Sequence, residues 1–283
     1  MVRTSFSFDD DKQLVQLVRR YEDAGARIVW ANVVHNMRHT GQISAVKQRL
    51  RSLKRSHGNQ ISQFPRKTTT PPSFLPMKAE EAVASIFVAI PAKLVKTYDG
   101  HSIHRNVGEI LPAGITKLLE EVDVVDGDVF VDIGAGLGNV VAQLILQTQV
   151  QRAIGIEIRE DIQPAGVDAM KNSLYYLAFQ ERTSFICRDV TDIQLPHEFP
   201  FAYATVVYWC NILFEQKVIE KVKVQLISMS TVRILMSAVN FCPRHRKLCT
   251  NRFCSSFELA KTADVPCSWK AKLIPFYIYK AKH

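Results

Sequence analysis

A short apolar run followed by three alternating glycines limits the folds open to this 283-residue chain more than any other segment. Residues 129–140 read VFVDIGAGLGNV, so the apolar run ends near Asp132 and passes through Gly134, Gly136 and Gly138 into a helical pattern. Glycine permits positive φ and lets a ligand approach the backbone at a helix N-terminus. The segment therefore predicts a strand, a tight turn and a helix, with a ligand site at the turn.

Two further carboxylates follow the next two apolar runs. Glu157 lies 25 residues after Asp132 in GIEI, and Asp189 follows in FICRDV. Because the carboxyl ends of parallel strands meet at one edge of a sheet, we expect all three carboxylates to surround the glycine turn. A carboxylate after the second strand can accept ribose hydroxyls, and one after the third can hold an adenine amino group.

The glycine spacing separates two kinds of nucleotide-like ligand. A dinucleotide site favours Gly-x-Gly-x-x-Gly, whereas this chain has Gly-x-Gly-x-Gly beginning two residues after an Asp. That pattern resembles the S-adenosylmethionine site of class I methyltransferases. A dinucleotide enzyme is the alternative.

Apolar runs and helical patterns alternate from residue 79 onward. Strands are expected at residues 129–132, 153–157, 184–187, 204–209, 231–236, 254–259 and 273–279. Helices are expected at residues 79–98, 109–122, 139–149 and 161–179, and after the fourth strand as far as 227. This alternation predicts an α/β fold with a doubly wound parallel sheet, the Rossmann-like class I methyltransferase domain, over residues 79–283.

Residues 1–57 have a different pattern, that of a small all-α three-helix module. The order of large side chains, Phe8, Trp30 and Leu50, resembles a Myb/SANT helix-turn-helix module. Residues 58–78 are rich in Thr, Pro and Ser, and we interpret them as a linker, with an ordered arm packed on the second domain as the alternative.

Positive charge is concentrated at the N-terminal end of the chain. The net charge is +9, and residues 1–70 hold 13 Lys and Arg against 5 Asp and Glu. We predict nucleic-acid contact by the third helix of the module, since phosphates attract such a basic surface. Binding of a histone tail or another protein, and a purely solvated helical cap, are the alternatives. The basic residues of this helix are Lys47, Arg49, Arg51, Lys54 and Arg55.

The six cysteines form no Cys-x-x-Cys pair and indicate a reduced, intracellular protein. Cys242, His245, Cys249 and Cys254 lie close together in the sequence, but their spacing fits no common zinc module. We therefore expect no metal. The N-terminus has no apolar core, and the longest uncharged stretch, residues 133–151, is too rich in Gly, Asn and Gln to span a membrane.

Three segments in the correct order resemble the disruptor-of-telomeric-silencing family, the non-SET histone H3 lysine methyltransferases. VVYWCNILFEQ, with Asn211 and Phe214, is similar to the family's Asn-Asn-Phe-x-Phe motif. VGEILPAGITKLLEEVDVVDGDVFVDIGAGLGNVVAQ is similar to its Gly-Glu-Thr loop, helix and glycine turn. CSWKAKLIPFYIYK is similar to its closing Val-Ser-Trp segment with two adjacent aromatics.

The resemblance implies roles for individual residues. The cofactor-binding residues would be Glu109 on the methionine amino group, Asp132, Gly134 and Gly136 at the methionyl part, Glu157 on the ribose and Asp189 at the adenine. Gly138, Asn139, Val190 and Asn211 would complete the cofactor site. Asn211 would lie beside the transferred methyl group. The lysine channel would be lined by Phe214, Trp269, Phe276 and Tyr277.

The sequence also departs from the family pattern. Asn139 replaces a Gln, Cys210 replaces the first Asn of the motif, and Phe276 replaces a channel Tyr. Phe276 and Tyr277 are adjacent, so in a strand they face opposite sides of the sheet and cannot line the channel equally. Trp269, Phe276 and Tyr277 are also plausible as plain core aromatics.

We expect a nuclear enzyme that methylates a lysine of histone H3 on the nucleosome, with S-adenosylmethionine as methyl donor and S-adenosylhomocysteine as product. Nucleosomal DNA is the expected second partner, and no membrane is expected. One alternative is a class I methyltransferase of RNA, DNA or a non-histone protein. Another is a catalytically silent protein that binds chromatin.

Overall fold

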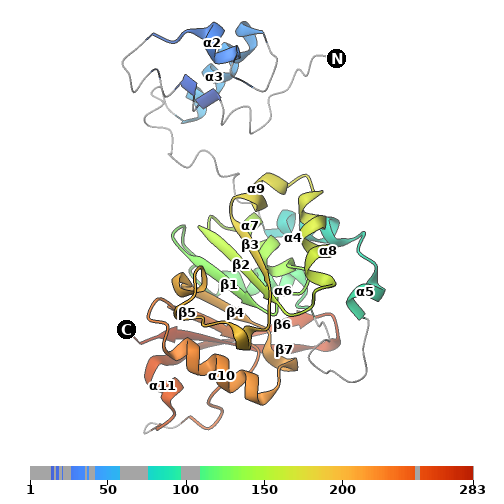
Figure 1. Ribbon diagram of the computed structural model, residues 1–283, viewed down its shortest axis with the longest axis vertical. Helices are drawn as coiled ribbons and strands as arrows, with labels where there is room; N and C mark the ends of the chain where they lie inside the picture. Colours follow the sequence, from blue (N-terminus) through green and yellow to red (C-terminus); the bar gives the residue numbers. More distant parts are fainter. Residues whose placement is uncertain are drawn as a thin grey trace. The chain divides into compact units, whose positions relative to one another are not determined.

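The computed structural model describes residues 14–15, 17–18, 21, 27–35, 37, 42–57, 76–96, 109–245 and 249–282. The chain divides into two compact units, residues 1–72 and residues 73–283, both drawn in Figure 1. The predicted linker, residues 58–78, falls largely outside the described residues, but its last three residues already belong to helix α4 (Pro76–Phe87).

The first unit contains helices α2 (Trp30–His35) and α3 (Ile43–His57). Leu14, Val18, Val33, Val46 and Leu50 are buried together, because each occupies the apolar side of its segment. Residues 14–15, 17–18 and 21, which precede α2 within the predicted three-helix module, are helical. Phe8 lies outside the described residues, so the three-helix module remains a prediction at its N-terminal end.

A seven-stranded sheet forms the centre of the second unit. Its strands are β1 (Val129–Ile133), β2 (Arg152–Glu157), β3 (Thr183–Cys187), β4 (Val206–Trp209), β5 (Ile234–Ser237), β6 (Phe257–Cys267) and β7 (Lys270–Ala281). Their order is β3-β2-β1-β4-β5-β7-β6. The first five strands are parallel, and β7 and β6 add an antiparallel hairpin at one edge. The predicted α/β class is confirmed, and the parallel part of the sheet carries an additional antiparallel hairpin at this edge.

Helices cover both faces of the sheet (Figure 1). One face packs against α4, α6 (Pro112–Glu120), α7 (Asn139–Gln147), α8 (Ile162–Lys171) and α9 (Tyr176–Gln180). The other packs against α10 (Gln216–Ile227) and α11 (Arg252–Ser256), together with the short 3-10 helices η3 (Val190–Asp192) and η4 (Phe201–Tyr203). We call these the first and second faces. Alternating strand residues divide between them, so Phe130 lies on the first face and Trp209 on the second.

Several predicted helices are shorter than expected, for local reasons. Pro91 separates α4 from the short α5 (Ala92–Lys96), consistent with the expected kink. Helix α6 begins at Pro112 rather than at residue 109, since Ile110 instead forms a bridge with Cys267 of β6. The helix predicted over residues 161–179 divides into α8 and α9 at Ser173. The Ser173 hydroxyl donates to the Met170 carbonyl and accepts from the Tyr175 amide, which interrupts the helical hydrogen bonds.

The strand predicted at residues 254–259 is a helix over its first half. Asn251 accepts a hydrogen bond from the Phe253 amide at 3.0 Å and starts α11, which holds Cys254. Strand β6 begins only at Phe257 and extends to Cys267. Its middle is exposed, so pairing with β7, rather than an apolar pattern, keeps this stretch extended.

Candidate functional site

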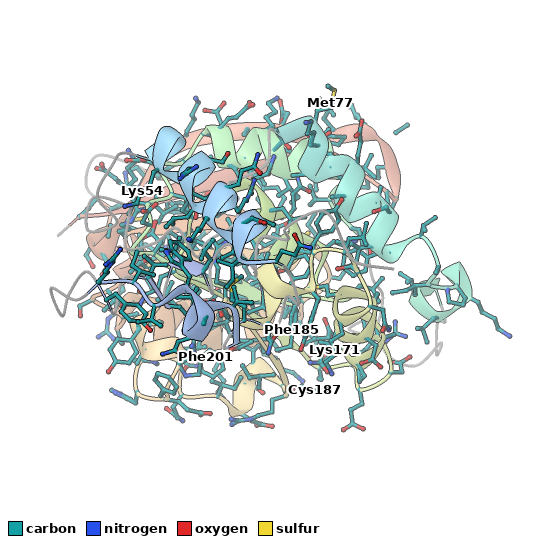
Figure 2. All side chains as sticks on the ribbon, turned by 90° about the horizontal axis from the view of Figure 1, so that it is seen from above. Lys54, Met77, Lys171, Phe185, Cys187 and Phe201 are labelled. Atoms are coloured by element: carbon teal, nitrogen blue, oxygen red, sulfur yellow. The ribbon has the colours of Figure 1, made fainter. Side chains whose placement is uncertain are left out.

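The glycine turn, residues 134–138, connects β1 to α7. Gly134, Gly136 and Gly138 have φ values of 82°, 55° and 90°, a region that strongly favours glycine. A Cβ on Gly134 would lie 3.0 Å from Cζ of Phe214, and one on Gly138 would lie 2.7 Å from Cε1 of Phe185, a β3 side chain labelled in Figure 2. The turn therefore needs glycine both for its backbone and for its two aromatic neighbours.

Asp132 is buried at the end of β1, directly before the turn. Its side chain is 1% exposed, and neither carboxylate oxygen has a hydrogen-bond partner among the described residues. Burial raises the pKa of Asp132 well above its usual range, and the negative charge of Glu157 raises it further. A buried carboxylate without a partner is costly, so this group fits a cationic or hydrogen-bond-donating ligand.

Glu157, at the end of β2, ties the second strand to the glycine turn. Its Oε2 accepts from the Gly136 amide at 2.7 Å, and its Oε1 accepts from the Arg159 amide at 2.9 Å. An ionised carboxylate can accept about four hydrogen bonds, so two acceptor positions remain for a ligand. Glu157 is 7% exposed, so its carboxylate is largely shielded from solvent.

Glu109 and Asn139 are brought together although 30 residues separate them in the sequence. Asn139 begins α7, and its side chain hydrogen-bonds Glu109. Burial raises the pKa of Glu109, and this hydrogen bond offsets part of the effect. The Ser268 amide donates to the Glu109 carbonyl at 2.9 Å, and the Glu109 amide donates to the Ser268 hydroxyl at 3.2 Å. These two hydrogen bonds hold the Glu109 segment against the β6–β7 turn.

Asp189 follows β3 and begins the short helix η3. Its Oδ1 accepts from the Thr191 amide at 2.7 Å, and the next residue, Val190, is 5% exposed in the core of the second face. The three predicted carboxylates thus lie at or just beyond the carboxyl ends of β1, β2 and β3, which are neighbours in the sheet. This is the edge at which open α/β sheets bind ligands.

Asn211 is fully buried directly after β4, in the 3-10 helix η5 (Asn211–Leu213). Its Oδ1 accepts from the Ser237 hydroxyl at 3.1 Å, while its Nδ2 has no partner among the described residues. Phe214 follows, and its ring packs edge-on against Trp209 with centroids 5.5 Å apart. The same ring covers Gly134, so the β4 segment and the glycine turn share one site.

The three predicted channel aromatics lie in different surroundings. Phe276 is fully buried on the first face and stacks on Tyr208 at 5.4 Å between centroids. Tyr277 is partly buried on the second face and pairs in register with Ser237, the partner of Asn211. Trp269, in the β6–β7 turn, packs partly buried against the first face. Of the three aromatics, Tyr277 is therefore the one connected to Asn211, through Ser237. Phe276 packs in the core instead.

Cys210 lies between β4 and Asn211 and packs against the core of the first face. Burial raises the pKa of its thiol to about 12, and the charge of Asp132 contributes. The thiol therefore stays neutral at physiological pH. It supplies neither a base nor a thiolate nucleophile to the site.

Two buried side chains support the site but carry no motif that marks them in the sequence. Arg159 is 6% exposed, pairs with Asp161, and donates to the backbone carbonyls of Leu94 at 2.9 Å and Val95 at 3.3 Å. Gln143 is 1% exposed and donates to Pro112 and Thr116, so it joins α7 to α6. Only the folded chain brings these partners together.

In the N-terminal unit, α3 carries the predicted nucleic-acid residues. Arg51 is exposed, and Arg49 and Lys54 are half-buried. The ammonium of Lys47 lies 5.5 Å from the centroid of the Trp30 ring, a cation–π contact. The side chain of Arg55 lies outside the described residues. DNA contact by α3 therefore stays a prediction.

The residues present fit S-adenosylmethionine. Asp132 offers buried acceptors without partners, Glu157 keeps acceptor capacity, and the turn carries no side chain at Gly134, Gly136 or Gly138, where the backbone has positive φ. The strand order, with an antiparallel β7 between β5 and β6, together with this site defines the class: an S-adenosylmethionine-dependent class I methyltransferase. Residues 85–280 match the family described as Histone methylation protein DOT1. The chain belongs to this family.

Several solved methyltransferase structures are similar to this chain. One is a Pyrococcus horikoshii protein provisionally assigned as an RNA methyltransferase, with 14% identity, coverage of 72% of this chain and 98% of that one, and a TM-score of 0.44. Another is the 23S rRNA methyltransferase ErmE, with 11% identity, coverage of 59% and 67%, and a TM-score of 0.42. Among the described residues, no helix combines the length and apolar character needed to cross a membrane.

Proposed function

We propose that this protein is a nuclear enzyme that methylates a lysine of histone H3 on the surface of the nucleosome. The observation that carries the proposal is Asn211, buried beside the glycine turn with its amide Nδ2 unpaired. Membership of a histone methylation family supports the choice of a histone substrate. The nucleosome, and the nucleus as its compartment, follow from that substrate.

The strand-end carboxylates hold the cofactor in this proposal. Asp132 and Glu109 face the methionyl part with its amino group, Glu157 binds the ribose, and Asp189 with Val190 binds the adenine. The cofactor supplies a methyl group on a positively charged sulfur. Asp132 then has the partner that it lacks in the free protein, which stabilises its charged form.

The acceptor lysine has to lose its proton before it can attack. A free lysine has a pKa of about 10.4, so nearly all of it is charged at pH 7. Phe214, Trp269 and Tyr277 form an apolar approach to Asn211 that disfavours the ammonium and orients the neutral amine. The described residues around Asn211 include no obvious general base, so we assign the proton to water at the channel mouth.

The substrate class can be tested with a panel of acceptors. Labelled S-adenosylmethionine is incubated with the full chain and with whole nucleosomes, free histones or RNA, and the label in each product is counted. The proposal predicts label on histone H3, with nucleosomes the best substrate. Label on RNA and none on H3 would show a different methyltransferase, and the absence of label with any acceptor would support a catalytically silent protein.

Asn211→Ala tests the role of this residue in the same assay. We expect at least a tenfold loss of methylation, because an amide at the methyl group positions the reactants, and a folded domain by circular dichroism. Asn172→Ala is the matched control, since Asn172 is an exposed asparagine at the end of α8. Wild-type activity in Asn211→Ala would refute the assignment.

A further inference from the structure

Four potential metal ligands, from the loop after β5 and from helix α11, converge outside the methyltransferase site. They are Cys242, His245, Cys249 and Cys254, which each offer one ligand atom. All four ligand atoms lie within 4.8 Å of one another, although twelve positions separate the first residue from the last. None of these side chains has a role in the cofactor site.

The distances suit a tetrahedral zinc ion. Sγ of Cys242 lies 3.6 Å from Sγ of Cys249. Zinc binds cysteine sulfur at about 2.3 Å, so two sulfurs on one tetrahedral ion lie about 3.8 Å apart. A disulfide would need a sulfur–sulfur distance of about 2.05 Å. A disulfide also joins only two cysteines and does not explain why four potential ligands converge. The donor set, three sulfurs and one imidazole nitrogen, is one that structural zinc sites use.

Backbone and amide contacts around the four residues hold the ligands in place. The Cys242 amide donates to the Asn240 side chain at 2.9 Å, and the His245 amide donates to the Cys242 carbonyl at 3.1 Å. Cys254 is fixed on α11, whose start is capped by Asn251. Hydrogen bonds of this kind orient the ligands of metal sites.

We infer that Cys242, His245, Cys249 and Cys254 bind one structural zinc ion, contrary to the expectation from their sequence spacing. Each thiol loses its proton to solvent as it binds, and the neutral imidazole completes four protein ligands with no open position for chemistry. Cys254 is buried, whereas Cys242 and Cys249 are partly exposed and His245 is exposed. The site is therefore open to solvent on the side of His245, where the ion can enter, and closed on the side of Cys254.

The site would join the loop after β5 to α11. Phe241, next to Cys242, packs against Phe253 at 4.9 Å and against Trp209 at 6.0 Å between ring centroids. The Phe241 amide donates to the Tyr279 hydroxyl at 3.0 Å. Since Trp209 also contacts Phe214, zinc would stabilise the aromatic packing behind the methyl-transfer site without touching the reacting atoms.

Metal analysis of the full chain tests the inference. The protein is purified without chelator, dialysed and measured by inductively coupled plasma mass spectrometry. We expect about one zinc per chain, and at least a tenfold lower zinc content in Cys254→Ser. Cys187→Ser is the matched control, because Cys187 is a half-buried thiol of β3 outside the cluster, and it should keep its zinc.

A second variant covers the case in which Cys254→Ser does not fold. His245 is exposed, so His245→Gln should fold and lower zinc affinity at least tenfold in a competition with a chromogenic chelator. Cobalt added to the zinc-free chain should give the strong visible bands of a tetrahedral thiolate site. A zinc-free chain that gives no such bands, or an intact mass two daltons low from a Cys242–Cys249 disulfide in the protein as purified, would overturn the inference.

Discussion

At the scale of single residues, Asp132 is the least satisfied group of the cofactor site. A carboxylate at 1% exposure without a partner destabilises the free protein, because its charged form has lost water and gained nothing. Function explains its presence, since a ligand that approaches the glycine turn with a positive charge or donors can satisfy it. We therefore expect Asp132 to lower the stability of the free protein and to strengthen the binding of the ligand.

The first prediction is that Asp132→Asn stabilises the free protein at pH 7. An unfolded Asp has a pKa of about 3.9, while the folded pKa of Asp132 is raised, so the folded state binds more protons between these values. Stability of the wild type falls as the pH rises through that window. The variant lacks this loss, worth about 1.4 kcal/mol for each pH unit by which the two pKa values differ.

Urea denaturation of both proteins between pH 4 and pH 8 measures the effect. The difference in the free energy of unfolding should shrink as the pH falls toward 4, because the pH then approaches the unfolded pKa of about 3.9 and the two states bind more nearly equal numbers of protons. S-adenosylmethionine should raise the melting temperature of the wild type but not that of the variant. A difference that does not change with pH would contradict the assigned cause.

The second prediction concerns Gly134. Gly134→Ala adds a Cβ at a φ of 82° and 3.0 Å from Phe214, so we expect a loss of stability of about 1–2 kcal/mol and weaker cofactor binding. Gly127→Ala is the matched control: no atom lies within 4 Å of its Cβ position, and its stability should change by less than about 0.5 kcal/mol. Equal denaturation midpoints for the two variants would show that the turn tolerates a side chain.

At the scale of elements, the sequence predicted the parallel strands well and the tail poorly. Strands β1 to β4 are short apolar runs that end near a chemically distinctive residue, such as Asp132 or Glu157, so their positions were visible. Strand β6 has an exposed, mixed middle and is held by long-range pairing with β7, which no local pattern reveals. The same holds for the site. Its glycines and carboxylates could be identified from sequence motifs, whereas Arg159 and Ser237 could be identified only from their contacts in the folded chain.

The third prediction tests how α5 is held. Arg159 donates to the carbonyls of Leu94 and Val95, so Arg159→Ala should release this helix and lower stability by about 1–3 kcal/mol. Limited proteolysis should then cut residues 88–96 several-fold faster. Lys261→Ala removes only an exposed ion pair with Glu121 and should cost less than about 1 kcal/mol. Unchanged cleavage in Arg159→Ala would show that other contacts hold α5.

At the scale of the whole molecule, charge and chemistry divide between two units. The basic excess belongs to residues 1–70, and the carboxylate-lined cofactor site belongs to residues 73–283. A basic unit contributes affinity for DNA through phosphates, with little sequence preference. The division predicts that substrate binding and cofactor binding can be separated.

The fourth prediction is that deletion of residues 1–72 weakens nucleosome binding but leaves S-adenosylmethionine binding unchanged. Fewer phosphate contacts should lower both the affinity and its dependence on salt concentration, since that slope scales with the contacts made. Fluorescence anisotropy with nucleosomes at several salt concentrations, and calorimetry with the cofactor, measure the two effects. Equal slopes with and without residues 1–72 would assign the charge excess another role.

Peptide mass spectrometry of histone H3 tests the central claim most directly. Nucleosomes are incubated with S-adenosylmethionine and either the wild-type chain or Asn211→Ala, and the H3 peptides are then compared. The proposed function predicts a methylated lysine on the core surface of H3 with the wild type and at least tenfold less with the variant. Unmethylated H3 in the wild-type reaction, or equal methylation by both proteins, would contradict it.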